Sequence, residues 1–574
     1  MIKLAKGRMS MWMVWSSVIF MIIQVYTTLR LPDLTSNLIN NGVAKGDLPY
    51  IYHTGAWMAF YSLISVLAGI ANVYTSSVAS QKLGTVLRRD IYDKVMNYSN
   101  EEFDRIGTSS LITRTTNDVV QIQNVTMMFL RMMIMSPIML VAASILAYDK
   151  SHQLTEIFLV AIPILVLVIG VAMYFAVPLF KSMQIKTDRI NLIFREGLNG
   201  VRVIRAFGRD KFEQDRFKTA NKDYTDNAIK VFSIMAAVFP LVTLVMSGTN
   251  VGITWFGGQL IAGQAMQVGD LVAFMTYAMQ VLMSFMMLAM IFVMVPRAQA
   301  SADRINQLFN EESTILDPSE SQAAGKQPEL SFKDVEFSYS GAEEPALSKV
   351  HFSTHSGQTV AIIGGTGSGK TTLVSLIPRF YDVDQGEITV NGQNIKNYSQ
   401  HDLRDLIALT PQKAILFTGT VRDNLKYGNP KASDDDLWHA LDIAQASDFV
   451  HELKGQLDGK VEQGGDNFSG GQKQRLAIAR SLVKKAAIYI FDDSFSALDF
   501  KTDAKLRAAL KQDSEIKKAI VVIVAQRIAT VVDADKILVL EDGKMTGSGT
   551  HEELKQSNNA YQEIIESQIR KGDQ

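Results

Sequence analysis

The chain has 574 residues, a formal net charge of −1 at pH 7 and no cysteine. The near-neutral charge argues against electrostatic binding to nucleic acid, which usually requires a basic domain. A sequence without cysteine also excludes disulfides, thiolate metal sites and a cysteine nucleophile. The mean hydropathy of +0.08 hides an apolar first half and a second half of ordinary soluble composition.

The N-terminus begins like a signal peptide, but its apolar run is too long for one. Lys3, Lys6 and Arg8 precede an apolar run over 11–29. A signal-peptide core has about 7–15 apolar residues and ends at a small-x-small cleavage site, and no such site follows this run. We therefore expect a first membrane helix that is retained.

Six apolar runs predict a membrane domain over residues 1–310. A spanning helix needs about 20 mainly apolar residues, and a soluble domain could not bury six runs of that length. Gly257-Gly258-Gln259 and Gly263 predict a short turn between the fifth and sixth runs. The runs lie at about 11–31, within 51–80, at about 127–148, at 157–180, at about 231–256 and at 271–295, where Pro296 closes the last.

The connections between these runs alternate in length and charge. Those after the second and fourth runs are long and rich in Lys and Arg, whereas the others are short. Because basic loops stay on the cytoplasmic side, the N-terminus, both long loops and the C-terminal half are expected there. The mixed polar and apolar pattern of the long loops predicts helices that continue into the cytosol.

Two features of the predicted membrane helices point to ligands. Arg131 stands near the start of the third run, where a charge is a functional hypothesis by default, although a position near a helix end favours snorkelling to the interface. The sixth run carries a methionine stripe with helical spacing, which suits varied apolar ligands but also ordinary helix packing or lipid contact. The stripe consists of Met275, Met279, Met283, Met286, Met287, Met290 and Met294.

A polar segment, 311–328, predicts a linker to a third region. From residue 329 to 574, short β-rich runs alternate with helical ones, which is typical of an α/β domain.

The strongest motif of the α/β region is a P-loop between a β-prone run and a helical run. Its backbone N–H groups would wrap phosphates. Lys370 would contact the β- and γ-phosphates of ATP, and Thr371 would bind Mg²⁺. An apolar run that ends in Asp492, about 120 residues later, is a Walker B pattern whose acid would also hold Mg²⁺. The P-loop residues are Gly364, Gly365, Thr366, Gly367, Ser368, Gly369, Lys370 and Thr371, followed by Thr372.

Between these motifs lies Phe468-Ser469-Gly470-Gly471-Gln472, which resembles the signature motif of ABC transporters. With six spans ahead of it, the whole chain resembles an ABC exporter half-transporter of the type IV fold. The resemblance implies that Tyr339 stacks on adenine, that Gln412 senses Mg²⁺ and contacts the membrane domain, and that Asp499 belongs to the D-loop. Glu462 lies near the acid of the X-loop.

In this family two half-transporters share two ATP sites, and each P-loop faces the signature motif of the other chain. The resemblance therefore implies a second half-transporter as partner, alongside the lipid bilayer. It also implies short coupling helices in the long loops, near Gly107–Asp118 and Leu198–Gly208, the second of which crosses to the partner.

Two positions depart from the pattern of an efficient ATPase. Asp493 stands where the family has the glutamate that orients the attacking water, and a carboxylate displaced by about 1 Å can cost on the order of 100-fold in rate. Gln526 stands where the family has a histidine, and an amide cannot titrate. The pair resembles the degenerate-site subunit of bacterial heterodimeric multidrug exporters; a homodimer with two slow sites is the alternative.

The sequence thus predicts a subunit of a heterodimeric exporter in a bacterial plasma membrane, with drugs or other small amphipathic compounds as cargo. Lipid or peptide cargo stays open, although the chain shows no extension for a peptidase. A non-transporting ATP sensor is disfavoured because Lys370 and Ser469 are both present. The six runs exclude soluble ABC ATPases.

Overall fold

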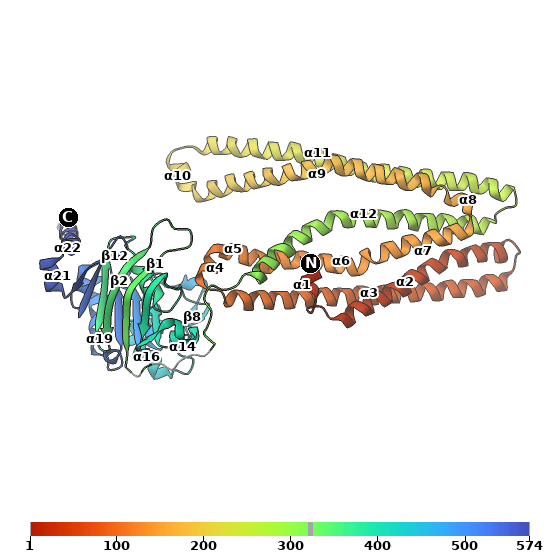
Figure 1. Cartoon of the computed structure of the whole chain (residues 1–574). Helices are drawn as coiled ribbons and strands as arrows, with labels where there is room; N and C mark the ends of the chain where they lie inside the picture. The colour runs from red at the N-terminus through yellow and green to blue at the C-terminus, as the bar shows by residue number, and fades with distance from the viewer. Residues whose placement is uncertain (1, 320–324, 326, 573–574) are drawn as a thin grey trace. The chain divides into compact units, whose positions relative to one another are not determined.

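The computed structural model describes residues 2–319, 325 and 327–572. The chain divides into two compact units, which are considered separately below. The membrane unit comprises Met1–Met96 and Ser109–Glu311, and the α/β unit comprises Asn97–Thr108 and Glu312–Gln574. A short segment from between two membrane helices therefore belongs to the α/β unit (Figure 1).

Six helical stretches of the membrane unit are long and apolar enough to cross a bilayer, which confirms the six predicted spans. A short helix α1 (Ile2–Ala5) precedes them. The stretches contain α2 (Met11–Asn37) with the π-helical η1 (Leu38–Val43), α3 (Leu48–Met96), α5 (Thr108–Thr113) to α7 (Met135–Lys150), α8 (His152–Thr155) with α9 (Phe158–Asn199), α11 (Asp210–Ala262) and α12 (Val268–Asn310). Between α5 and α7 lie η2 (Arg114–Asp118), α6 (Val119–Met128) and η3 (Phe129–Met133).

Two predicted helix ends are wrong. The turn predicted at Gly257 lies inside α11, because this glycine serves close packing: a Cβ there would come within 2.3 Å of Leu271 Cδ1. The sixth helix does not end at Pro296 but continues as α12 to Asn310. Residues beyond the proline, such as Ala298 and Ala302, are fully buried, and tertiary packing overrides local helix propensity.

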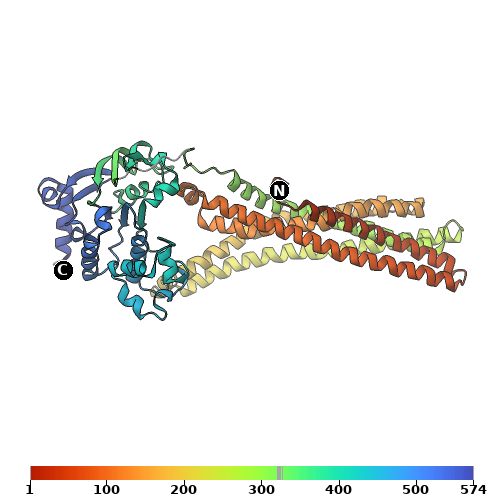
Figure 2. The same cartoon turned by 90° about the horizontal axis from the view of Figure 1, so that it is seen from below.

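The membrane helices pack in pairs. α2 lies beside α3, α7 beside α12, and α9 beside α11 (Figures 1 and 2). At the ends of α2, α7 and α12, Lys150 Nζ lies 2.9 Å from Asp33 Oδ1 and 3.0 Å from Asp270 Oδ1. This charge cluster joins three helices, and Ser36 Oγ donates to Asp270 Oδ1 at 2.7 Å.

The pair α9–α11 has a different environment from the other helices. It packs on α12 near α8 through a small cluster that includes Leu165, Val242 and Leu282, and it diverges from the rest of the unit toward α10 (Val201–Ala206) (Figure 1). Toward α10, Phe194 and Phe232 are more than half exposed. The short helix α10 lies inside the second predicted coupling range, and α5 lies inside the first, directly after the short helix α4 (Asn100–Ile106).

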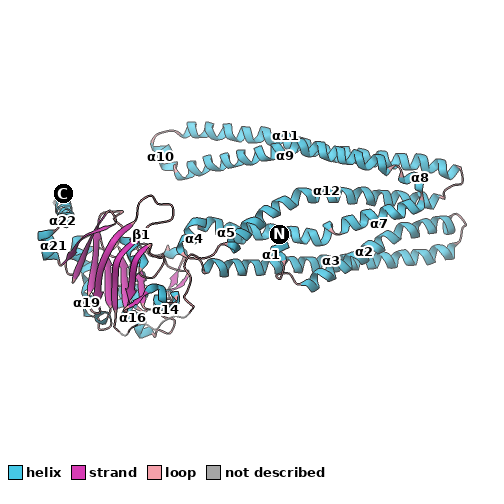
Figure 3. Ribbon diagram, viewed as in Figure 1, coloured by secondary structure: helices cyan, strands magenta, loops and turns pink. Residues whose placement is uncertain are grey.

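The α/β unit is built on one ten-stranded sheet (Figure 3). Its order is β5-β4-β1-β2-β12-β11-β3-β10-β9-β6, in which β11, β3, β10, β9 and β6 run parallel. The strands are β1 (Glu329–Phe337), β2 (Leu347–His355), β3 (Thr359–Gly364), β4 (Gln385–Val390), β5 (Gln393–Asn394), β6 (Ile407–Thr410), β9 (Ile488–Asp492), β10 (Ile520–Val524), β11 (Lys536–Glu541) and β12 (Lys544–Gly549). A separate two-stranded sheet pairs β7 (Gly419–Thr420) with β8 (Lys460–Val461).

The central strands bury both of their faces, so they read as continuous apolar runs rather than as alternating ones. Successive side chains of a strand point to opposite faces, and in β3 Val360 and Ile362 join one core while Ala361 and Ile363 join the other. One core packs beneath helices such as α18 (Gly470–Leu482), and the other contains α13 (Lys370–Leu376). The two cores fix the register of the strands that carry the site.

The segment of α4 is held in the α/β unit by polar contacts to the linker. The backbone N–H of Thr314 donates to Glu102 Oε1 at 3.1 Å, and the hydroxyls of Ser99 and Thr314 lie 2.9 Å apart. Tyr381 OH donates to Asp104 Oδ2 at 3.2 Å. These contacts join residues that are more than 200 positions apart in the sequence.

Candidate nucleotide-binding site

Four adjacent parallel strands bring the predicted site residues to one edge of the sheet. β3 ends at Gly364 and leads into the P-loop, and its neighbour β10 leads to Gln526. β9 ends at Asp492, and β6 leads to Gln412. Ligands of open parallel sheets bind outside the carboxyl ends of the strands, and these residues lie there.

The P-loop needs its glycines for backbone shape and for space. Gly367 and Gly369 have φ angles of 84° and 94°, which favour glycine. A Cβ at Gly369 would come within 2.8 Å of the Ala346 carbonyl oxygen. Helix α13 begins directly after Gly369, so the first N–H groups of the helix have no side-chain cap. Such an end favours an anion.

Lys370 is buried, with 8% of its surface exposed. Its Nζ donates to the carbonyl oxygens of Gly364 at 3.0 Å and Gly365 at 2.5 Å. Burial lowers the pKa of Lys370, and the nearby carboxylates of Asp493 and Asp492 oppose that shift. Because Lys370 forms no ion pair with a carboxylate among the described residues, its ammonium fits an anionic ligand such as a phosphate.

Thr371 and Asp492 form an oxygen pair suited to a hard cation. Thr371 Oγ1 donates to Asp492 Oδ1 at 3.1 Å. Burial raises the pKa of the Asp492 carboxyl, the Thr371 hydrogen bond lowers it, and the charge of Asp493 raises it further. Mg²⁺ prefers carboxylate and hydroxyl oxygens of this kind together with phosphate oxygens, so the residues fit that ion.

Asp493 is held by two amides. Gln526 Nε2 donates to Asp493 Oδ2 at 2.8 Å, and Gln412 Nε2 donates to the same oxygen at 3.2 Å. The backbone of Asp493 is left-handed, with φ of 45°, and its N–H donates to Val524 O at 3.0 Å. Two residues singled out as departures from an efficient site are thus in direct contact.

Tyr339 lies at the side of the P-loop helix. Its hydroxyl is 3.1 Å from Thr372 Oγ1, and 41% of its surface is exposed. Its ring also meets the edge of Tyr381 at a centroid distance of 5.5 Å. An exposed aromatic face beside a phosphate-binding loop is suited to stacking on a base.

Ser469 and Asp499 form local cap hydrogen bonds, whereas Ser496, just before Asp499, donates its hydroxyl to the Asp493 carbonyl oxygen at 2.8 Å. Ser469 caps α18: the N–H of Gln472 donates to Ser469 Oγ at 3.3 Å, and the N–H of Ser469 donates to Gln472 Oε1 at 2.9 Å. Asp499 caps α19 (Phe500–Gln512), and hydrogen bonds from the backbone and side chain of Thr502 lower its pKa. Across the described residues, no hydrogen bond connects Ser469–Gln472 with the P-loop.

Comparison with known proteins identifies the family. Residues 14–320 match the transmembrane region of ABC transporters, and residues 347–496 match the ABC transporter domain. A chain of Mycobacterium tuberculosis (strain CDC 1551 / Oshkosh), described as an uncharacterized ABC transporter ATP-binding protein, is 39% identical over 563 residues, which cover 96% of this chain and 95% of the relative. This chain belongs to the ABC transporter family.

Two further similarities bear on the type of ABC transporter. A multidrug resistance ABC transporter ATP-binding and permease protein of Lactococcus lactis subsp. lactis is 30% identical, over 95% of this chain and 91% of the relative. The solved structure of a bacterial Atm1-family ABC exporter with ATP bound is similar in fold, with a TM-score of 0.81 and 24% sequence identity. The superposition covers 97% of this chain and 99% of the solved chain. The second similarity shows an exporter fold, in agreement with the predicted class.

The sequence interpretation of this ABC transporter missed Tyr381. It lines a cavity of about 500 Å³ together with Phe337, Tyr339, Asp104 and Thr314. Burial raises the pKa of Tyr381 to about 12, and the neighbouring carboxylate of Asp104 adds to the shift. No motif marks Tyr381, because the residues that surround it come from segments far apart in the chain.

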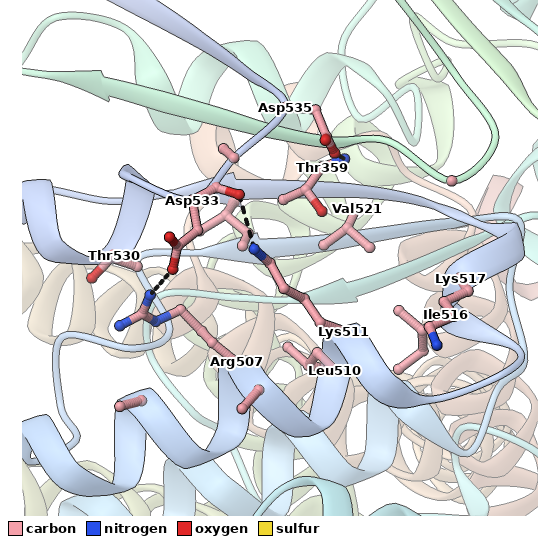
Figure 4. Close-up of a pocket in the computed structure, with 15 residues that line it drawn as sticks. Thr359, Arg507, Leu510, Lys511, Ile516, Lys517, Val521, Thr530, Asp533 and Asp535 are labelled. Carbon is pink, nitrogen blue, oxygen red and sulfur yellow. Dashed lines mark hydrogen bonds and ion pairs between the residues drawn. The ribbon is translucent and has the colours of Figure 1, made fainter. Parts of the chain in front are cut away.

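A second cavity of about 500 Å³ lies at the opposite end of the strands (Figure 4). It is lined by Thr359 and Val521 at the amino ends of β3 and β10, and by α19. This end is opposite to the P-loop, and two of its charged side chains contact Asp533: Arg507 lies 3.6 Å from the Asp533 carboxylate, and Lys511 Nζ donates to the Asp533 carbonyl oxygen at 3.0 Å. It is therefore separate from the nucleotide site.

Proposed function

We propose that this chain is one subunit of a heterodimeric exporter that moves drugs or other amphipathic compounds out of a bacterial cell across the plasma membrane. Its own site holds ATP with Mg²⁺ and hydrolyses it slowly. Its Ser469–Gln472 segment completes the faster site of the partner subunit. The similarity to a multidrug resistance transporter supports this type of cargo.

The observation that carries the proposal is the contact between Asp493 and Gln526. A general base must reach the attacking water and pass its proton on. The Asp493 carboxylate is one methylene shorter than glutamate and accepts hydrogen bonds from two neutral amides. Neither amide can take up a proton, so this arrangement favours holding the nucleotide over cleaving it.

The groups that bind ATP are all present in the same site. Lys370 and the free N–H groups at the start of α13 would neutralise phosphate charge, and Tyr339 would stack on the base. Mg²⁺, held by Thr371 and Asp492, would supply further charge neutralisation of the phosphates. Gln412, whose amide donates to Asp493 Oδ2 at 3.2 Å, would help to hold that ion.

Two features support a second subunit. Among the described residues, Ser469–Gln472 forms no hydrogen bond with the P-loop of its own chain, because Ser469 and Gln472 bond to each other in the cap of α18. The α9–α11 pair exposes large apolar side chains, among them Phe194, Phe232 and Phe239. Apolar surface on this scale is covered by lipid or by protein, and a partner half-transporter would provide part of that cover.

The test compares the ATPase of the purified chain alone with that of the chain co-purified with the half-transporter encoded beside it. We expect a rate at least about tenfold higher for the pair, because the general base at the second site comes from the partner. Removing the partner's Walker B glutamate should abolish the gain. A chain that alone hydrolyses ATP as fast as the pair would support the homodimer instead.

A further inference from the structure

The membrane unit contains a cavity of about 770 Å³ that includes Arg131. Its walls come from α2, α3, η3, α7 and α12. The polar lining residues include Gln24, Ser65, Asn72, Ser77 and Arg131, and the apolar ones include Val66, Ile70, Met132, Met135 and Met287. Among the described residues that line it, Arg131 alone carries a formal charge at neutral pH.

Arg131 lies inside a long helical stretch, near one end of its membrane-spanning part. It lies within the continuous helical stretch Thr108–Lys150, 19 residues before Lys150, on the order of 28 Å along the axis at about 1.5 Å per residue. That distance places it close to one boundary of a hydrocarbon core about 30 Å thick. Its side chain lines the cavity and is half-buried.

The local backbone also distinguishes this position. Arg131 is in the middle of the π-helical turn η3 (Phe129–Met133). Such turns interrupt α-helices at a cost in hydrogen-bond geometry and are frequent at functional sites. The Arg131 guanidinium forms no hydrogen bond or ion pair with the described residues, whereas Arg88 on α3 donates to Gln123 Oε1 at 3.0 Å.

The remaining lining suits a molecule with both polar and apolar parts. A Cβ at Gly69 would come within 3.2 Å of Gln24 Nε2, so this glycine leaves space for the amide of Gln24 next to the cavity. Met132, Met135 and Met287 provide flexible apolar walls. Of the methionine stripe, Met287 lines the cavity; the side chains of Met290 and Met294 lie outside the described residues.

We propose that this cavity, which we name the Arg131 cavity, binds transported amphipaths that carry an anionic group, and that the Arg131 guanidinium pairs with that group. This inference rests on the proposed export function and names its substrate class. A planar guanidinium forms paired hydrogen bonds with a carboxylate or sulfonate, and a charge inside a membrane protein is stabilised when it meets its counter-ion.

The test uses two probes that differ only in charge. Pyrenebutyrate is an anion at neutral pH, and pyrenebutanol is its neutral analogue. Binding is measured by fluorescence titration, without ATP, to the complex of this chain and its partner in phosphatidylcholine nanodiscs, with empty nanodiscs as blank. We expect Arg131→Gln to weaken the anion about tenfold and the alcohol less than about twofold, because a charged hydrogen bond is lost. Arg131→Lys should retain the preference for the anion.

Two controls separate charge from folding. Arg189→Gln removes the same charge from an exposed side chain on α9 that lies outside the cavity, and should leave both affinities unchanged. Met287→Ala should weaken both probes alike. Equal binding of the two probes by the unchanged protein, or an equal loss of both in Arg131→Gln, would overturn the inference.

A final measurement distinguishes a cargo from a resident lipid, and this inference from the proposed function. ATP-driven uptake of pyrenebutyrate into vesicles, lost in Arg131→Gln, would support both. If binding depends on Arg131 but neither probe is taken up with ATP, the result would support the binding site and contradict the export function. If pyrenebutanol is taken up equally by the unchanged protein and by Arg131→Gln, and the anion is not preferred, the result would support the export function and overturn the proposed anion site. Displacement of the anion by phosphatidylglycerol that ATP does not move would assign the cavity to lipid.

Discussion

Two helix N-termini in the α/β unit, those of α13 and α18, differ in how their first N–H groups are satisfied. α13 follows Gly369 and has no side-chain cap, and the buried ammonium of Lys370 lies beside it. α18 begins with a complete capping box between Ser469 and Gln472. The first is prepared for an anion within its own chain, whereas the second satisfies its N–H groups locally. Under the proposed function, the α18 end would meet a phosphate only when another chain brings one.

The largest effect is expected at α13. Lys370→Ala should weaken ATP binding to the chain by on the order of 300-fold, since breaking a buried ion pair costs about 3–5 kcal/mol. Titration with a fluorescent ATP analogue measures it. Lys485→Ala is the control, because Lys485 is an exposed lysine that pairs with Asp436, and it should leave the affinity unchanged. A similar affinity for Lys370→Ala and the unchanged chain would contradict the assignment of the P-loop.

The α18 end should behave in the opposite way. Ser469→Ala should leave ATP binding to the isolated chain unchanged but lower the ATPase of the complex about 100-fold, as expected when a donor to the transition state is lost. Ser433 forms the same capping box with Asp436 on α16 (Asp434–Ile443), so Ser433→Ala should lower the Tm to a similar extent without lowering the ATPase. A parallel loss of rate in both variants would reduce the role of Ser469 to capping.

Restoring the missing base should reduce the difference between the two sites. With the partner's Walker B glutamate removed, the double variant Asp493→Glu and Gln526→His should raise the residual ATPase rate by about 30-fold. This gain is smaller than the loss of on the order of 100-fold in rate that a displacement of about 1 Å can cause. Asp493→Glu alone should give less, because Gln526 cannot exchange a proton. No gain from the double variant would show that another feature limits this site.

The smallest effect is expected at Tyr339. Tyr339→Ala should weaken ATP about tenfold, since stacking on a base contributes about 1–3 kcal/mol. Tyr339→Phe keeps the ring and loses only the 3.1 Å contact with Thr372 Oγ1, so its affinity should change less than about threefold. Isothermal titration with ATP and Mg²⁺ measures both. An equal loss in the two variants would assign the effect to the hydroxyl.

The sequence predicted much of the nucleotide site because its residues follow strands. Each of Gly364, Gln412, Asp492 and Gln526 comes at or directly after an apolar β run, and parallel strands place such positions at one edge. The contact of Gln526 with Asp493 could not be predicted, because it depends on the strand order β3-β10-β9-β6. That order is set by long-range packing, not by local motifs.

Prediction was weaker in the membrane unit, because the composition of an apolar run indicates whether it can span a membrane but not which neighbours its residues pack against. The six spans were confirmed, but Gly257 and Pro296 were wrongly interpreted as helix ends, since neighbouring helices decide whether such residues break a helix. The π-helical turn at Arg131 could not be predicted, because its extra residue leaves no apolar pattern to recognise.

The segment of α4 has a mechanical consequence. Since Asn97–Thr108 belongs to the α/β unit, the chain passes between the two units at three places: after Met96, after Thr108 and after Glu311. A unit joined by one chain connection can rotate freely, whereas three connections restrict its rotation. Gly107, with φ of 79°, stands beside one of these passages, so a residue with a side chain there would strain the backbone at that point.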